Sequence, residues 1–129
     1  MLHGIVDTYN TGCYDMERAR WFEFVWLPTF DRTAKKLLGE NDRRAIEAEL
    51  CQDLEAGDLI KRTGGFRKFR YALEGGGKSG GARIIYFRDE SCERVYMILV
   101  YQKGMKETLT RAEENELRVL AAQLKNEEC

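Results

Sequence analysis

Residues 64–87 read GGFRKFRYALEGGGKSGGARIIYF, and this stretch decides the fold. Apolar and charged residues alternate on both sides of a glycine-rich segment. Alternation with a period of two is typical of strands, and clustered glycines are typical of turns. We therefore predict two antiparallel strands, over 66–73 and 82–89, joined by a flexible, cationic hairpin loop.

The chain before this hairpin changes from strand-like to helical spacing. Residues 20–27 (RWFEFVWL) alternate as a first strand would. Apolar residues at helical spacing then predict a helix over 30–38, ended by Gly39. A second helix is predicted to follow at once, capped by Asn41 and stopped by Gly57.

The chain after the hairpin contains one more strand and one more helix. Residues 93–102 (ERVYMILVYQ) are apolar on both alternating faces, which predicts a central strand covered on both sides. Thr110 and Glu113 then form a T-x-x-E capping box. The apolar face of the helix that follows consists of Leu117, Leu120, Ala121 and Leu124.

These elements predict an α+β fold, in which an antiparallel sheet carries a helical hairpin after its first strand and a C-terminal helix. We expect a single domain over 19–126, preceded by a leader of unknown role at 1–18. The four cysteines lack metal-ligand spacing and one histidine cannot complete a Cys/His set. We therefore expect no metal and no other cofactor. A reducing cytosol is the simplest compartment, and the chain has no apolar run long enough for a membrane span.

The net charge of −1 hides a sharp division along the chain. Between Lys61 and Arg88 there are eight cations and one carboxylate, a local net charge of +7. Between Glu40 and Asp58 seven carboxylates face two arginines. Because salt screens charges over about 8–10 Å, a local excess of this size can bind phosphates whatever the global charge.

The hairpin fixes which cations share a face. We predict that Leu73 pairs with Ala82, so that Lys68, Arg70 and Arg83 emerge together. The opposite face then receives the apolar set Phe69, Tyr71, Leu73, Ile84 and Tyr86, which suits packing against the helices. A register shifted by one residue would bury Arg83 among those side chains, at a high cost for an unpaired cation.

Two interpretations of the cationic face remain open at this point. A solvated, solubilising surface is the simpler one. Aromatic residues interleaved with the cations favour single-stranded RNA instead, because unpaired bases stack on aromatic rings. In this second interpretation the predicted RNA contacts are Arg67, Lys78, Tyr86, Phe87 and Tyr101, with Phe66 nearby.

Several motifs of the chain also resemble the RelE/ParE toxin superfamily, and most closely its HigB-like branch. The resemblance covers roughly Phe22 to Leu124. In that branch a helix ends in a Gly-Asp turn, a TGG-[LF]-RK-x-R strand and a glycine- and lysine-rich loop follow, and GG-x-R-[IV]-[IV]-Y precedes a last strand ending in lysines. The matching positions are Gly57-Asp58, Thr63 to Arg70, Gly80 to Tyr86 and Tyr101 to Lys106.

The resemblance implies a RelE-like fold and a cytoplasmic toxin of a type II toxin–antitoxin pair. Such a toxin is a ribosome-dependent endoribonuclease, an mRNA interferase that cuts mRNA in the A site. Its partners would be the ribosome, the mRNA and a cognate antitoxin with a helix-turn-helix domain, with DNA reached only through the antitoxin and no membrane contact. The implied catalytic residues are Lys68, Arg70, Arg83, Lys103 and Lys106. The chain departs from some members of the superfamily at Thr108-Leu109-Thr110, where those members carry a catalytic tyrosine.

The expected reaction is attack of a 2′-hydroxyl on the adjacent phosphate. Arg70 and Arg83 are the candidate phosphate clamp, because guanidinium groups stay charged and present a fixed fork of donors. Nearby positive charge favours the neutral form of a lysine, which makes Lys68 the candidate base. Lys103 or Lys106 would donate a proton to the leaving oxygen. A ParE-like gyrase inhibitor and a non-catalytic single-stranded RNA-binding module are the alternatives.

Overall fold

The computed structural model describes residues 8–73, 81–104, 109–127 and 129. Its helices are α2 (Pro28–Ala34), α3 (Glu40–Gln52) and α4 (Arg111–Lys125). Its strands are β1 (Tyr9–Asp15), β2 (Arg20–Trp26), β3 (Asp58–Leu59), β4 (Phe66–Tyr71), β5 (Ala82–Asp89) and β6 (Arg94–Gln102). The α+β class is therefore as expected. Within the described part of the chain, no helix is long and apolar enough to cross a membrane.

The six strands form one sheet in the order β1-β2-β6-β5-β4-β3. The expectation of a wholly antiparallel sheet is wrong at one place, because β2 and β6 are parallel neighbours. Parallel neighbours require a crossover connection. Here residues 27–93, which include the two helices and three other strands, return the chain to the same end of the sheet. β1 and β3 are additional edge strands that the sequence did not predict.

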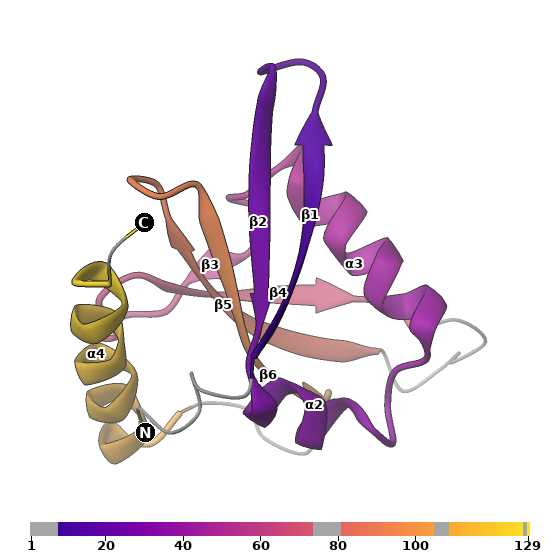
Figure 1. Cartoon of the computed structure of the whole chain (residues 1–129). Helices are drawn as coiled ribbons and strands as arrows, with labels where there is room; N and C mark the ends of the chain where they lie inside the picture. Colours follow the sequence, from indigo (N-terminus) through magenta and orange to yellow (C-terminus); the bar gives the residue numbers. More distant parts are fainter. Residues whose placement is uncertain (1–7, 74–80, 105–108, 128) are drawn as a thin grey trace.

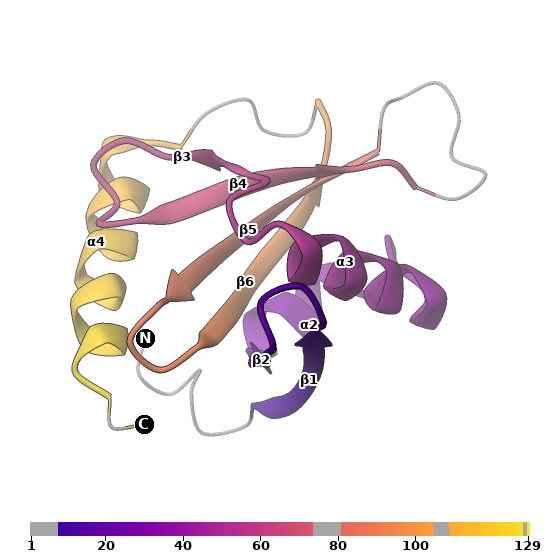
Figure 2. The same ribbon diagram turned by 90° about the horizontal axis from the view of Figure 1, so that it is seen from above.

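The sheet has a hydrophobic core on each face. Figures 1 and 2 show α2 and α3 on one side of the sheet and α4 on the other. The first core includes Phe24, Trp26, Phe30, Ile46, Leu50 and Tyr86. The second includes Val25, Phe66, Ile85, Phe87, Leu117, Leu120 and Leu124. β6 lies between β2 and β5 and is buried on both faces at Val95, Tyr96, Met97, Ile98 and Val100, which confirms the prediction of a central strand.

The helical hairpin begins and ends differently from the prediction. α3 starts at Glu40, after Gly39, and the backbone N–H of Gly39 donates a 2.9 Å hydrogen bond to the carboxylate of Asp42. Asn41 is thus inside the helix and does not cap it. Gly57 does not stop α3 either; it sits beside β4, where an added Cβ would lie 2.8 Å from the carbonyl oxygen of Lys68.

The residues of the β4–β5 hairpin lie on the predicted faces of the sheet, but the register of the two strands differs from the prediction by two residues. Tyr71, and not Leu73, pairs with Ala82, so Arg70 lies directly opposite Arg83. The reason is Gly81, whose φ of +80° suits glycine and whose hypothetical Cβ would lie 2.2 Å from the carbonyl oxygen of Tyr71. The chain therefore returns close beside Tyr71. The loop that the sequence predicts between the strands lies mostly outside the described residues.

The C-terminal helix agrees with the prediction in detail. Thr110 accepts a 3.1 Å hydrogen bond from the backbone N–H of Glu113, and the Glu113 carboxylate accepts a 2.8 Å bond from the N–H of Thr110. This is the predicted capping box. The predicted apolar face is buried against the sheet at Leu117, Leu120, Ala121 and Leu124.

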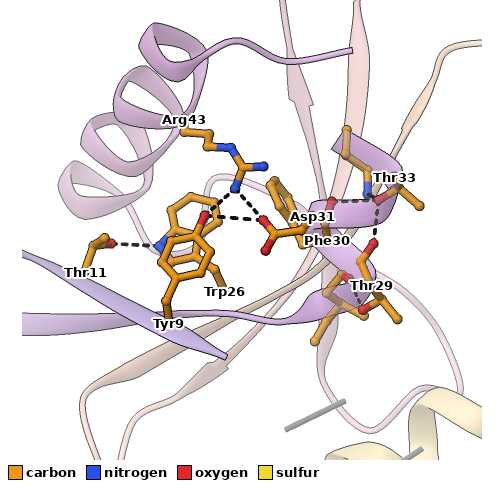
Figure 3. A network of polar contacts seen from close by, with 10 residues as sticks. Tyr9, Thr11, Trp26, Thr29, Phe30, Asp31, Thr33 and Arg43 are labelled. Carbon is orange, nitrogen blue, oxygen red and sulfur yellow. Dashed lines mark hydrogen bonds and ion pairs between the residues drawn. The ribbon is translucent and has the colours of Figure 1, made fainter. Parts of the chain in front are cut away.

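The leader predicted over 1–18 contains β1, which pairs with β2 along its whole length. Side chains fasten β1 to the helices. Figure 3 shows Tyr9 between Asp31 of α2 and Arg43 of α3, with an Arg43–Asp31 distance of 2.8 Å. In the same network the indole N–H of Trp26 donates to Thr11 over 2.7 Å. Residues 1–7 lie outside the described part.

The four cysteines form two disulfides, which the interpretation of a reducing cytosol did not foresee. One joins Cys13 of β1 to Cys51 of α3, and the other joins Cys92, in the β5–β6 turn, to Cys129. Each bond links positions 37 or 38 residues apart. Each therefore ties an edge of the molecule to a distant segment.

Candidate nucleic-acid interface

Three cations of the β4–β5 hairpin share the face of the sheet that carries α4. Lys68 pairs with Ile85, and Arg70 pairs with Arg83. On the next strand Arg83 lies opposite Tyr101. This confirms the prediction that Lys68, Arg70 and Arg83 emerge together. The correct register brings the two arginines closer than predicted, because directly opposed residues are the nearest neighbours across strands.

Lys103 joins these residues at the end of β6. Its backbone N–H donates a 3.0 Å hydrogen bond to the carbonyl oxygen of Gly81, which extends the β5–β6 ladder by one step. Gly104 follows with a φ of +90° and begins the turn away from the sheet. Lys68, Arg70, Arg83 and Lys103 are called the cationic cluster below.

The side chains of the cationic cluster have almost no partners, in contrast to three partly buried arginines elsewhere in the molecule. Arg43, Arg88 and Arg94 each form an ion pair with a carboxylate at 2.8–3.2 Å. In the described part of the chain Lys68, Arg70 and Lys103 have no side-chain hydrogen bond or ion pair, and Arg83 reaches only the carbonyl of its neighbour Ala82 at 3.4 Å. Like charges held opposite each other destabilise a sheet. A bound anion would remove that repulsion.

Two adjoining hollows surround the cationic cluster. The smaller one, of about 170 Å³, is lined by Asp58, Lys68, Arg70, Arg83, Tyr101, Lys103 and Gly104. The larger one, of about 440 Å³, is lined by Arg70, Tyr71, Ala72, Leu73, Gly81, Arg83 and Lys103. Arg70, Arg83 and Lys103 belong to both hollows. A polyanion crossing this end of the sheet would therefore contact the same three cations from one hollow to the next.

Asp58 is a member of the site that was not among the predicted catalytic or RNA-binding residues. It lies on β3 directly opposite Lys68 and lines the smaller hollow. In the described part of the chain Asp58 has no ion pair or side-chain hydrogen bond, not even with Lys68. A carboxylate at hydrogen-bonding distance from a substrate hydroxyl can act as a general base. The only sequence signal for Asp58 was the Gly-Asp turn of the family resemblance.

The remaining predicted cations are not all in the cluster. Arg67 lies on the opposite face of β4, where its guanidinium donates to the carbonyl oxygen of Gly57 over 2.7 Å. This corrects its expected role as an RNA contact on the cationic face, because adjacent strand residues point to opposite sides. Lys78 and Lys106 lie outside the described residues, and their predicted roles remain predictions.

Two of the aromatic residues predicted to stack on RNA are inside the protein instead. Phe87 is only 2% exposed and packs on Phe66 at 5.0 Å between ring centroids. Tyr86 is fully buried on the other face, where its hydroxyl donates to the carbonyl oxygen of Leu54 over 2.8 Å and accepts from the N–H of Gly57. Burial raises the pKa of the Tyr86 phenol. The alternation of aromatic and cationic residues predicted that these rings stack on RNA bases. That pattern does not distinguish rings on the exposed face of a strand from rings on its buried face.

Tyr101 is the predicted aromatic residue that does lie in the site. It is half-buried, stands opposite Arg83 and lines the smaller hollow with the cations. Arg70, Arg83 and Tyr101 therefore form a row across β4, β5 and β6, with the tyrosine ring next to the arginine pair. Its position suits either stacking on a base or a hydroxyl contact to a phosphate.

A larger hollow lies elsewhere on the described part of the chain. It has a volume of about 750 Å³ and lies between β1 and α3, with the carboxylates of Asp15, Glu17 and Asp53 in its lining. Carboxylates repel phosphate, so its size does not make it a competing anion site. Among the described residues, no group of three or more His, Cys, Asp or Glu side chains could hold a metal ion.

The site can therefore neutralise a phosphate, and it places Asp58 and Lys68, two groups that can exchange a proton with a substrate, on neighbouring strands. Arginine and lysine side chains within hydrogen-bonding distance of a phosphate stabilise the negative charge that develops on it during the reaction. No protein-family model matches the chain.

Proposed function

We propose that the chain is the toxin of a type II toxin–antitoxin pair, of the RelE/ParE superfamily and its HigB-like branch, with a RelE-like topology. In this proposal it is a ribosome-dependent endoribonuclease that cuts mRNA in the A site and stops translation in the cytoplasm. Its antitoxin carries a helix-turn-helix domain and makes the contact to DNA. The observation that supports the proposal most is the unpartnered cationic cluster on one sheet face.

The cluster suits a transesterification at phosphorus. The substrate 2′-oxygen attacks the adjacent phosphorus, the bond from phosphorus to the 5′-oxygen breaks, and a 2′,3′-cyclic phosphate and a 5′-hydroxyl result. Arg70 and Arg83 bind the phosphate oxygens and stabilise the additional charge of the transition state. The pairing of these two residues across β4 and β5 supports this role.

Two protons must move in this reaction. The 2′-hydroxyl proton goes to Lys68 or to Asp58, which lies directly opposite Lys68 on β3. Lys103 gives a proton to the leaving 5′-oxygen. The bound message on the ribosome supplies the in-line geometry that these few side chains do not fix themselves.

Cytoplasmic action has a consequence for the two disulfides. Thiols are kept reduced in the cytosol, so in this proposal the toxin acts with reduced cysteines. The bond from Cys13 to Cys51 lies on the opposite face of the sheet, and Cys92 lies at the opposite end of the β5–β6 hairpin from Arg83. We therefore expect the reduced chain to keep the cationic cluster and its activity.

Purified translation tests the proposal. Stalled ribosomes are incubated with the wild-type chain or with Arg83→Ala, and message ends are mapped by primer extension. We expect new ends at the A-site codon with the wild type and far fewer with the variant, whose folding is checked by circular dichroism. An intact message with the wild type would contradict the nuclease. Binding of single-stranded RNA without any cleavage would support the non-catalytic module instead.

A further inference from the structure

An apolar cleft lies between α4 and the sheet, and the proposed mechanism does not use it. Its volume is about 190 Å³, below the roughly 300 Å³ at which pockets for drug-sized ligands begin. Its apolar walls come from β5, β6 and α4, and include Ile85, Leu99, Leu117 and Leu120. A cavity with this size and lining suits a single flat ring.

The floor of the cleft is fixed by an irregularity in β6. Ile85 pairs with Leu99 and Tyr86 pairs with Met97, which leaves Ile98 as an extra residue. A β-bulge of this kind redirects side chains, and here Ile98 and Leu99 both line the cleft. The Thr29 hydroxyl donates to the carbonyl oxygen of Ile98, so α2 holds the bulge in place.

The cleft lies next to the cationic cluster along β5 and β6. Ile85 and Arg83 are two residues apart on β5 and face the same side, as do Leu99 and Tyr101 on β6. Two residues of a strand span about 6.6–6.8 Å. That distance is within the reach of one nucleotide. A phosphate held by Arg83 would therefore place a neighbouring base at the mouth of the cleft.

Carboxylates border the cleft, although its floor is apolar. Glu113 lines it and is already engaged in the helix cap with Thr110. Glu116 lines it too, is exposed, and has no side-chain partner in the described part of the chain. Carboxylates accept hydrogen bonds from N–H donors. An apolar protein side chain in the cleft would make no use of this acceptor, whereas a base with an exocyclic amino group would.

We propose that this cleft binds a nucleobase with an exocyclic amino group next to the phosphate held by Arg70 and Arg83, which makes it a specificity site for the RNA. The base lies against Leu99 and Leu109, which are the partly exposed apolar residues of the lining, and donates its amino hydrogen to Glu116. The inference depends on the proposed RNA substrate. It adds that the chain distinguishes adenine, cytosine and guanine, which carry such an amino group, from uracil, which has none.

Fluorescence anisotropy with short 2′-O-methyl oligonucleotides, which cannot be cleaved, tests the inference. The probes are oligo-A, oligo-C, oligo-U and an abasic strand of equal length. We expect the wild type to bind oligo-A and oligo-C about tenfold more tightly than oligo-U, as for one additional hydrogen bond to a charged group. Glu116→Gln should lose most of this preference, and the charge-matched control Glu49→Gln on α3 should keep it.

A second variant tests the cleft itself. Leu109→Phe enlarges a half-buried side chain in the cleft lining and should reduce binding of every base-bearing strand to the level of the abasic one, with an unchanged salt dependence. If the wild type binds all four probes with equal affinity, and that affinity falls with salt as for phosphate contacts, the base site is overturned. The proposal of an RNA substrate would not be affected by that result. Failure of the wild type to bind any probe would overturn both. Loss of binding to the antitoxin alone in Leu109→Phe would identify the cleft as a protein contact and overturn the inference.

Discussion

Replacing Arg83 with glutamine should weaken RNA binding and stabilise the fold at the same time. Arg83 is half-buried, lies directly opposite Arg70 and has no carboxylate partner. Its positive charge therefore opposes folding and favours a bound phosphate. Glutamine keeps part of the side-chain length and removes the charge.

The two effects have different sizes. Like charges directly opposite each other on neighbouring strands cost roughly 0.2–1 kcal/mol, so Arg83→Gln should raise the unfolding free energy by about that amount. For a domain of this length the melting temperature should rise by roughly 1–4 °C. Loss of a charged hydrogen bond to phosphate costs roughly 1.5–3 kcal/mol, which is about tenfold or more in affinity.

Thermal unfolding and anisotropy with a 2′-O-methyl oligonucleotide measure the two effects on the same samples. The slope of log affinity against log salt should become less negative by about 0.7, as for one lost phosphate contact on a single strand. Arg44→Gln on α3 is the matched control, because it makes the same change in an exposed residue on the opposite face. A loss of stability without a loss of affinity would refute the reasoning.

Further predictions concern Tyr86, Asp58 and the disulfide between Cys13 and Cys51. Tyr86→Phe should lower the unfolding free energy by about 1–3 kcal/mol in chemical denaturation, since two buried hydrogen bonds are lost, without changing RNA affinity. Because burial raises the pKa of Tyr86 in the folded chain, the wild type should lose stability as the pH rises above about 10, where the unfolded phenol ionises, and the variant should lose less. Asp58→Asn should tighten RNA binding about two- to fivefold in anisotropy, because it removes a negative charge from the cationic hollow. Replacing Cys13 and Cys51 with serine should cost up to about 4 kcal/mol, the chain-entropy value for a separation of 38 residues, and calorimetry should show a melting temperature lower by about 10 °C or more.

Local chemistry made parts of the fold predictable from the sequence. The capping box of α4 needs only Thr110 and the residue three positions later, and the structure contains both of its hydrogen bonds. The shared face of Lys68, Arg70 and Arg83 follows from the period of a strand and from the cost of burying a cation. These features depend on residues close together in the chain.

Other features depend on contacts that no short pattern contains. The register of the hairpin is set by the backbone of Gly81 beside Tyr71. β1 (YNTGCYD) has few apolar residues and is held by distant side chains such as Arg43. Tyr86 is buried because its hydroxyl meets the backbone of Leu54, 32 residues away. The stacking role predicted for its ring therefore failed for a reason that lies in the tertiary structure.

The most direct test of the central claim is the chemistry of the message ends on stalled ribosomes. Wild type, Arg70→Gln and Arg44→Gln are compared, and new 5′-hydroxyl ends are labelled with polynucleotide kinase. The account predicts A-site ends with a 5′-hydroxyl for the wild type and for Arg44→Gln, and a loss of at least about a hundredfold in their rate of formation for Arg70→Gln. Equal cleavage by all three chains, or no cleavage by the wild type, would contradict it.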